Sequence, residues 1–173
     1  HPINSMYEGM AYLPEDRKNE GIIADLSVRE NLIIALQAKR GIFHLLSKKQ
    51  QEEFTDKYIE TLQIKTASRE TPIKSLSGGN QQKALLGRWL YCKPEILIID
   101  EPTRGIDVGA KYEIHKILCD LAKNGTSVIM VSSEMPEVIG ISNRVLVVSQ
   151  GHITGELQRE ELTQETIMKY AAV

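Results

Sequence analysis

The sequence predicts an α/β protein with a parallel sheet and a small helical subdomain. Residues 96–99 form a continuous aliphatic run, which is typical of a strand covered on both faces in a parallel sheet. From there to residue 148, strand-like and helix-like segments alternate, which favours helical crossovers between parallel strands. Residues 27–72 carry two consecutive amphipathic helical patterns, so we expect a helical region there.

The composition is that of a folded globular protein. Of the 173 residues, 42% are hydrophobic and 25% are charged, a balance that excludes a wholly disordered chain. The formal net charge of −2 gives no overall basic field, so we expect no nucleic-acid partner. Cys92 and Cys119 lie in apolar helical segments, which favours a reducing, cytosolic compartment over a disulfide framework.

The first half of the chain is predicted to hold one strand and two helices. Residues 10–13 form a short strand that Pro14 ends, and a charged loop follows. Ser27 and Glu30 match a capping box, which predicts a helix from that point, and a second capped helix is expected over residues 48–63.

The second half of the chain is predicted to alternate strands and helices after a glycine turn. The expected elements are a helix from the turn to Leu90, strand 96–99, helix 108–123, strand 127–131, helix 135–139, strand 144–148, a hairpin into 153–157 and a helix after Thr163. We therefore expect one domain, in which residues 27–83 form the helical subdomain and residues 1–26 and 84–173 form the α/β part.

Two adjacent carboxylates, Asp100 and Glu101, end the aliphatic strand. Open α/β sheets bind ligands at this end of their strands. In a phosphoryl-transfer site, Asp100 would orient Mg²⁺ directly or through water, and Glu101 would polarise the attacking water. An ordinary strand end with two solvated acids is the alternative.

A glycine turn opens the helix that precedes this strand. Ser77, Gly78, Gly79, Asn80 and Gln81 lie at the helix N-terminus, where unpaired amides and the helix dipole favour an anion. Glycines there let a phosphate approach the backbone. The turn alone leaves open a plain helix start without a ligand.

Taken in order, three segments resemble the motifs of ATP-binding-cassette (ABC) ATPases. LSGGNQQK is similar to the signature, IIDEP to the Walker B motif and Thr103–Asp107 to the D-loop. The resemblance implies part of a P-loop NTPase core that binds ATP and Mg²⁺. It also implies that Asp107 lies where two cassettes meet.

Longer segments are similar to the second of two fused cassettes in bacterial monosaccharide importers, namely residues 12–18, 76–83 and 100–111. The likeness covers nearly the whole chain and implies the ATP-hydrolysing subunit of a sugar importer. Its partners would be the N-terminal cassette of the same polypeptide, transmembrane permease subunits and, indirectly, a periplasmic sugar-binding protein. It implies a peripheral place on the cytoplasmic face of the inner membrane. The resemblance does not distinguish between importers of ribose, galactose and arabinose.

Two positions depart from the general cassette pattern. Glu15 occupies the place of the Q-loop glutamine, and Ser133 occupies the place of the switch histidine that would contact the γ-phosphate. This pattern implies a degenerate site, in which Glu101 and Ser133 hold the catalytic positions; a plain strand-end serine is the alternative at Ser133. No GxxxxGK[ST] segment occurs, so we expect a fragment that begins after the P-loop and is inactive alone.

Two other classes share some of these features. An ABC ATPase of the chromosome-maintenance or translation-factor kind uses the same signature and Walker B motif but needs long coiled coils or basic extensions, which this sequence lacks. A purely structural interaction module is the third interpretation. The PEDR and RGIDVGAK segments favour the importer.

Overall fold

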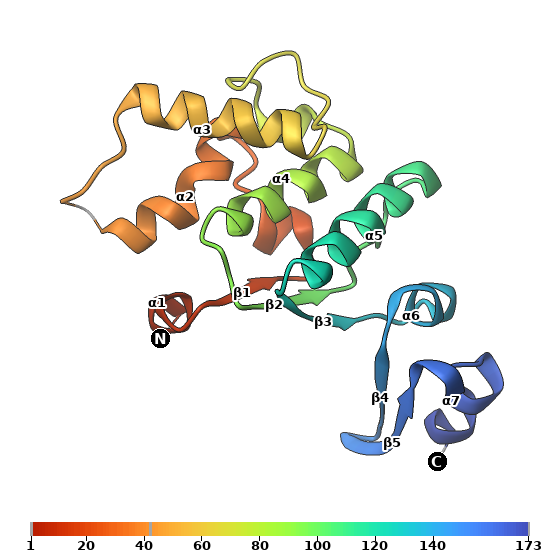
Figure 1. Ribbon diagram of the computed structural model, residues 1–173. Helices are drawn as coiled ribbons and strands as arrows, with labels where there is room; N and C mark the ends of the chain where they lie inside the picture. Colours follow the sequence, from red (N-terminus) through yellow and green to blue (C-terminus); the bar gives the residue numbers. More distant parts are fainter. Residues whose placement is uncertain (1, 42, 173) are drawn as a thin grey trace. The chain divides into compact units, whose positions relative to one another are not determined.

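The computed structural model describes residues 2–41 and 43–172, and it divides the chain into two compact units at the Val131–Ser132 bond. In the first unit, helices lie over a short parallel sheet (Figure 1). Its elements are α1 (Pro2–Tyr7), β1 (Met10–Leu13), η1 (Arg17–Gly21), α2 (Val28–Arg40), α3 (Lys48–Thr61), η2 (Ile73–Ser75), α4 (Gly78–Leu90), β2 (Ile96–Asp100), α5 (Val108–Lys123) and β3 (Ser127–Val131). The predicted α/β class is confirmed, whereas the sequence gives no sign of α1.

The sheet of the first unit has the strand order β1-β2-β3, and all its strands are parallel. Met10 pairs with Ile96, and Ile96 pairs with Ser127. Because the three strands run in register, their carboxyl ends meet at one edge of the sheet. Glu15 follows β1 at this edge, and Asp100 ends β2 there.

Within the first unit, the described residues cover one face of this sheet. Leu97 and Ile99 of β2 are fully buried, whereas Tyr12 and Ile129 on the opposite face are 49% and 52% exposed. The expectation of a strand covered on both faces is therefore wrong, because β2 alternates between buried and half-buried residues. The helices α4 and α5 lie on the same side of the sheet (Figure 1).

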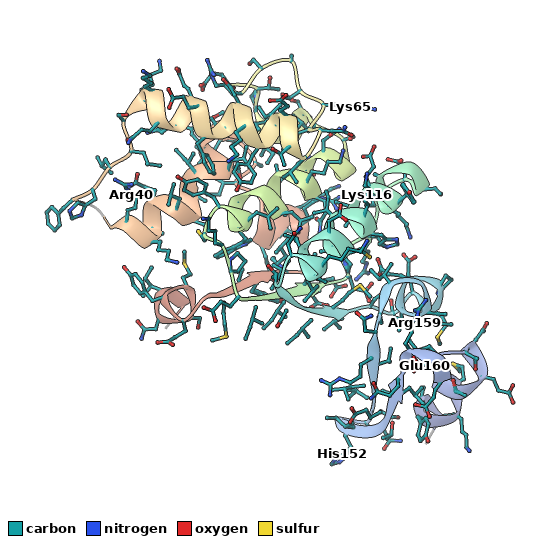
Figure 2. The ribbon with its side chains drawn as sticks, in the orientation of Figure 1. Arg40, Lys65, Lys116, His152, Arg159 and Glu160 are labelled. Carbon is teal, nitrogen blue, oxygen red and sulfur yellow. The ribbon has the colours of Figure 1, made fainter. Side chains whose placement is uncertain are left out.

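The helices α2 and α3 pack against each other and enclose an apolar cluster of Val28, Leu32, Ile33, Leu46 and Phe54. The capping box at Ser27 and Glu30 is present as predicted. Arg40, labelled in Figure 2, ends α2 and donates from Nε to the carbonyl of His44 at 3.1 Å. The predicted subdomain over residues 27–83 lies inside the first unit, and its boundaries stay a prediction.

A buried guanidinium connects α4 to α2 and to the loop before it. Arg88 donates from Nε to the carbonyl of Asn31 at 2.8 Å, from Nη1 to the carbonyl of Gly21 at 2.7 Å and from Nη2 to Asn31 Oδ1 at 2.9 Å. Burial lowers the pKa of Arg88 to about 10. These bonds fix the end of η1, and thereby the loop that carries Glu15 and Arg17.

The second unit contains α6 (Met135–Ile141), β4 (Arg144–Ser149), β5 (His152–Gln158), η3 (Arg159–Glu161) and α7 (Gln164–Ala171). The alternating pattern predicts that β4 continues the parallel sheet; instead it pairs antiparallel with β5 in a separate sheet. Gln150 and Gly151 adopt positive φ angles of 49° and 81° and close the predicted hairpin between β4 and β5. Val147, Leu157, Leu162 and Ile167 form the core of this unit.

Candidate functional site

The two carboxylates predicted to handle metal and water lie at the carboxyl end of β2. Asp100 is the last residue of the strand and pairs with Val131 of β3. The Glu101 amide donates to the Val131 carbonyl at 2.8 Å, and Glu101 has a φ of 45°, in the left-handed region that few non-glycine residues adopt. The chain therefore turns sharply at Glu101, and both carboxylates are half-buried at the ligand-binding edge of the sheet.

The segment after these carboxylates ends in a helix cap. Asp107 Oδ1 accepts a hydrogen bond from the Ala110 amide at 3.0 Å and thereby caps α5. Sequence reasoning assigned Asp107 to a cassette interface and missed this cap, which an Asp before a helical pattern signals. Asp107 is exposed, and the proposed interface role stays a prediction.

The glycine turn leaves the N-terminus of α4 open. Ser77 occupies the N-cap position but makes no side-chain cap bond, and its carbonyl accepts the first helical bond, from the Gln81 amide at 2.9 Å. The amides of Gly78, Gly79 and Asn80 therefore have no acceptor within the helix. Three amides that point out of a 13-residue helix suit an anion.

Asn80 and Gln81, which the sequence predicts to lie at the nucleotide, also make hydrogen bonds that hold the glycine turn in place. Asn80 Nδ2 donates to Ser77 Oγ at 2.8 Å, while Asn80 Oδ1 accepts from the Lys65 amide at 2.8 Å. Gln81 is buried, and its Nε2 donates to the Leu76 carbonyl at 3.0 Å. The sequence does not reveal these roles, because it does not show which segments lie beside the turn.

Both glycines of the turn lie against neighbouring segments. A Cβ atom on Gly79 would collide with the Ala110 Cβ of α5, and one on Gly78 would lie 3.2 Å from the Gly105 carbonyl oxygen. The turn therefore touches the segment that follows the two carboxylates. Glycine is therefore required here for packing against these segments.

Glu15 lies in the exposed loop after β1 and forms an ion pair with Arg104. The Arg104 amide in turn bonds the Glu101 carbonyl at 3.2 Å. The structure thus links the loop after β1 to the segment that follows the two carboxylates, a contact that the sequence does not reveal. Glu15, the glycine turn and residues 103–107 are brought together in the first unit.

Ser133 lies in the second unit, whereas the other predicted site residues lie in the first unit. It is exposed, and the neighbouring Ser132 Oγ accepts from the Glu134 amide at 3.0 Å. In the described part of the chain no group of three His, Cys, Asp or Glu residues is arranged to hold a metal ion. A magnesium ion at Asp100 would therefore need ligands from a nucleotide or water.

The sequence is similar to the ABC transporter family, whose profile matches residues 2–104. It is 51% identical over 171 residues to the ribose import ATP-binding protein RbsA of Clostridium tetani, and the match covers 98% of this chain and 34% of that protein. The galactose/methyl galactoside import ATP-binding protein MglA of the same organism is also 51% identical, with the same coverage. The fructose import ATP-binding protein FruK of Bifidobacterium longum is 46% identical, over 99% of this chain and 34% of that protein. The chain thus spans about a third of the length of these relatives.

Solved cassettes share the fold. An inward-facing conformation of a putative metal-chelate type ABC transporter superposes with a TM-score of 0.80 at 17% identity, over 95% of this chain and 63% of that chain. The ADP conformation of the cassette MJ1267 gives a TM-score of 0.75 at 20% identity, over 98% and 70% of the two chains.

Proposed function

The chain belongs to the ABC transporter family, and from this premise we propose that it is part of the ATP-hydrolysing subunit of a bacterial sugar importer. The observation that carries the proposal is the open N-terminus of α4, where the amides of Gly78, Gly79 and Asn80 have no acceptor within the helix and the two glycines lie against residues 105–110. We also propose that the chain corresponds to the second of two cassettes, as the likeness of residues 100–111 implies.

We propose that the glycine turn binds the γ-phosphate of ATP held by the N-terminal cassette. The Ser77 hydroxyl and the amides of Gly78 and Gly79 would donate hydrogen bonds to phosphate oxygens, helped by the dipole of α4. Asn80 and Gln81 would hold the turn in place through their bonds to Ser77 Oγ and the Leu76 carbonyl. Asp107 would face the partner cassette from the start of α5.

The half-buried carboxylates at the end of β2 suit a hard cation and a water molecule. Asp100 would hold Mg²⁺ directly or through water, and Glu101 would accept a proton from the attacking water. When bound with ATP, Mg²⁺ neutralises charge on the phosphate oxygens. We propose that this second site is degenerate, because Glu15 and Ser133 replace the glutamine and histidine of other cassettes.

A transmembrane permease is the proposed partner on the helical side of the first unit. The helices over residues 27–72 and the loop after Pro14 would contact it. A cavity of about 240 Å³ opens beside that loop, lined by Tyr12, Leu13, Pro14, Glu20, Gly21, Leu85, Arg88 and Trp89. The likeness to importer subunits supports a proposed peripheral place on the cytoplasmic face of the membrane. In the described ranges, every helix is too short or too polar to cross a bilayer.

The proposal is tested with the full-length importer reconstituted with its permease in proteoliposomes. Ser77→Arg should abolish sugar-stimulated ATP hydrolysis, because a large cation would fill the space in front of the turn. Ser77 is exposed and its side chain caps no helical amide, so the change removes only the surface bond from Asn80 and should leave the fold intact. Glu101→Gln should reduce the rate less, because it belongs to the degenerate site.

A matched substitution separates loss of the site from loss of the fold. Gly79→Ala introduces no charge but pushes against Ala110, so it should lower the unfolding temperature, which Ser77→Arg should not do. If Glu101→Gln proves more damaging than Ser77→Arg, the assignment of the competent site to the N-terminal cassette is wrong. If the wild-type importer hydrolyses no ATP, the proposed function itself fails.

A further inference from the structure

Arg17 is held by a compact turn directly after β1. Asp16 Oδ1 accepts from the amides of Lys18 and Asn19 at 3.1 and 3.0 Å, and its Oδ2 accepts from Asn19 Nδ2 at 2.7 Å. At the other end of η1, the Gly21 carbonyl is bound by Arg88. Both ends of the turn are therefore fixed, and Arg17 projects from a rigid base.

The guanidinium of Arg17 joins three segments that lie far apart in the sequence. Its Nε donates to Gln81 Oε1 at 3.2 Å, across 64 positions, and its Nη1 donates to the Arg104 carbonyl at 3.4 Å, across 87 positions. A Cβ on Gly78 would lie 2.9 Å from its Nη2. From the loop after β1, the planar fork of one side chain thus contacts both the glycine turn and the segment that follows the two carboxylates.

Charge alone does not explain this placement. Both oxygens that accept from Arg17, the Gln81 side-chain amide oxygen and the Arg104 carbonyl, are neutral. Burial lowers the pKa of Arg17, and the charge of Asp16 partly offsets this. A cation beside the N-terminus of α4 also opposes the helix dipole. The side chain instead fixes the glycine turn relative to the segment at Arg104, because it donates a hydrogen bond to each of them.

We propose that Arg17 is a positioning residue that sets the glycine turn 77–79 in the orientation required for its phosphate contacts. This inference rests on the proposed function. Its chemical basis is that a misplacement of about 1 Å in a binding group can lower a rate by roughly 100-fold. Gln81 transmits the effect, because its Nε2 and Oε1 join the base of the turn to Arg17.

The ion pair between Glu15 and Arg104 lies beside the Arg17 contacts, but it can be removed without removing them. Arg17 bonds the main-chain carbonyl of Arg104, whereas Glu15 bonds the Arg104 side chain. Arg104→Ala therefore removes the ion pair and keeps the acceptor of Arg17. An effect of Arg17 substitutions should persist in an Arg104→Ala background.

The first experiment probes how firmly the glycine turn is held and does not depend on ATP hydrolysis. Hydrogen exchange of the Gln81 amide, which donates to the Ser77 carbonyl at 2.9 Å, is followed in the full-length, nucleotide-free protein. The proteins compared are the wild type, Arg17→Met, Arg17→Lys and the control Lys18→Met, which replaces an exposed side chain. We expect exchange about fivefold faster or more in both Arg17 variants, because lysine lacks the planar fork, and no change in Lys18→Met. Full protection in Arg17→Lys would overturn the proposal, since charge alone would then suffice.

The second experiment measures the reaction in the reconstituted importer. Arg17→Met should lower kcat about tenfold or more while the KM for ATP stays within about twofold, because the turn acts after ATP is held by the other cassette. An unchanged kcat, or a fall in kcat without faster exchange of the Gln81 amide, would overturn the positioning role. An inactive wild-type importer would refute the proposed function alone, because the exchange comparison does not depend on activity.

Discussion

Lys83 of α4 and Glu113 of α5 form an ion pair with unequal burial. Their Nζ and Oε2 atoms lie 2.5 Å apart, with 3% of the lysine side chain and 42% of the glutamate side chain exposed. Lys83 Nζ also donates to the Gln63 carbonyl at 3.0 Å. A nearly buried cation in the signature segment thus depends on a half-exposed anion from the next helix.

This inequality predicts unequal responses to substitution. Glu113→Ala should lower the free energy of unfolding by about 2 kcal/mol, because it leaves a buried ammonium with a carbonyl as its remaining partner. Lys83→Met should lower it by less than about 1 kcal/mol, because the remaining carboxylate can be hydrated. Denaturant titration of the two variants and the double variant measures this; equal losses would contradict it.

The hydroxyls of Thr55 and Thr103 are buried and have no hydrogen-bond partner in the described structure. Replacing a buried, unpaired hydroxyl by a methyl group removes its desolvation penalty, so Thr55→Val and Thr103→Val should each raise the free energy of unfolding by about 1 kcal/mol. Thermal unfolding of each variant provides the measurement.

The two threonines also act as controls for each other. Thr55 lies in α3, away from the proposed site, and Thr103 follows Glu101 closely. Thr55→Val should leave ATP hydrolysis unchanged. Destabilisation of both variants would show that their hydroxyls find partners after all.

The capping box at the start of α2 should make stability sensitive to acid. Hydrogen bonds from the backbone and hydroxyl of Ser27 hold the pKa of Glu30 below its ordinary value. Because the folded pKa is the lower one, the carboxylate stabilises the fold above the unfolded pKa of about 4.3, and this contribution is lost as the pH falls through the folded pKa.

Glu30→Gln should therefore flatten the loss of unfolding free energy between about pH 5 and about pH 3. Glu53→Gln on the outer face of α3 is the matched control, because its carboxylate lies in a solvent-exposed pair with Lys49. Denaturant titration at both pH values compares them. Identical slopes for wild type and Glu30→Gln would rule out a contribution from this cap.

A close contact in the second unit makes Gly155 intolerant of a side chain. A Cβ there would lie 2.5 Å from Cγ of Tyr170 in α7, so Gly155→Ala should lower stability by about 1–3 kcal/mol. At Gly140 in α6, an added Cβ would meet nothing within 4 Å, so Gly140→Ala should be neutral or stabilise by roughly 0.5–1 kcal/mol. Near-UV circular dichroism during thermal unfolding measures both; equal effects would contradict the contact.

Local signals in the sequence predict local structure well. The cap at Ser27 is present with its predicted partner Glu30, and the helix predicted after Thr163 is present, with Thr163 as its N-cap. The hairpin predicted at Gln150 and Gly151 is confirmed. Such features depend on residues within a few positions of each other.

Long-range relationships are harder to predict. The sequence marks the glycine turn and the two carboxylates, but it does not indicate that Arg17 bonds Gln81 or that β4 leaves the parallel sheet. Sequence periodicity reports which side of an element is apolar and carries no information on which distant segment meets it. The exposed face at Tyr12 and Ile129 escapes prediction for the same reason.

The junction at Arg17 has a consequence for the order of folding. Contacts across 64 and 87 positions close large loops, with an entropic penalty of roughly 4 kcal/mol each before any bond is gained. The α2–α3 hairpin and the β4–β5 hairpin need no such closure and can form early. Pairing of β1 with β2 closes a loop of the same size, so we expect the glycine turn to acquire its final shape once these strands have paired.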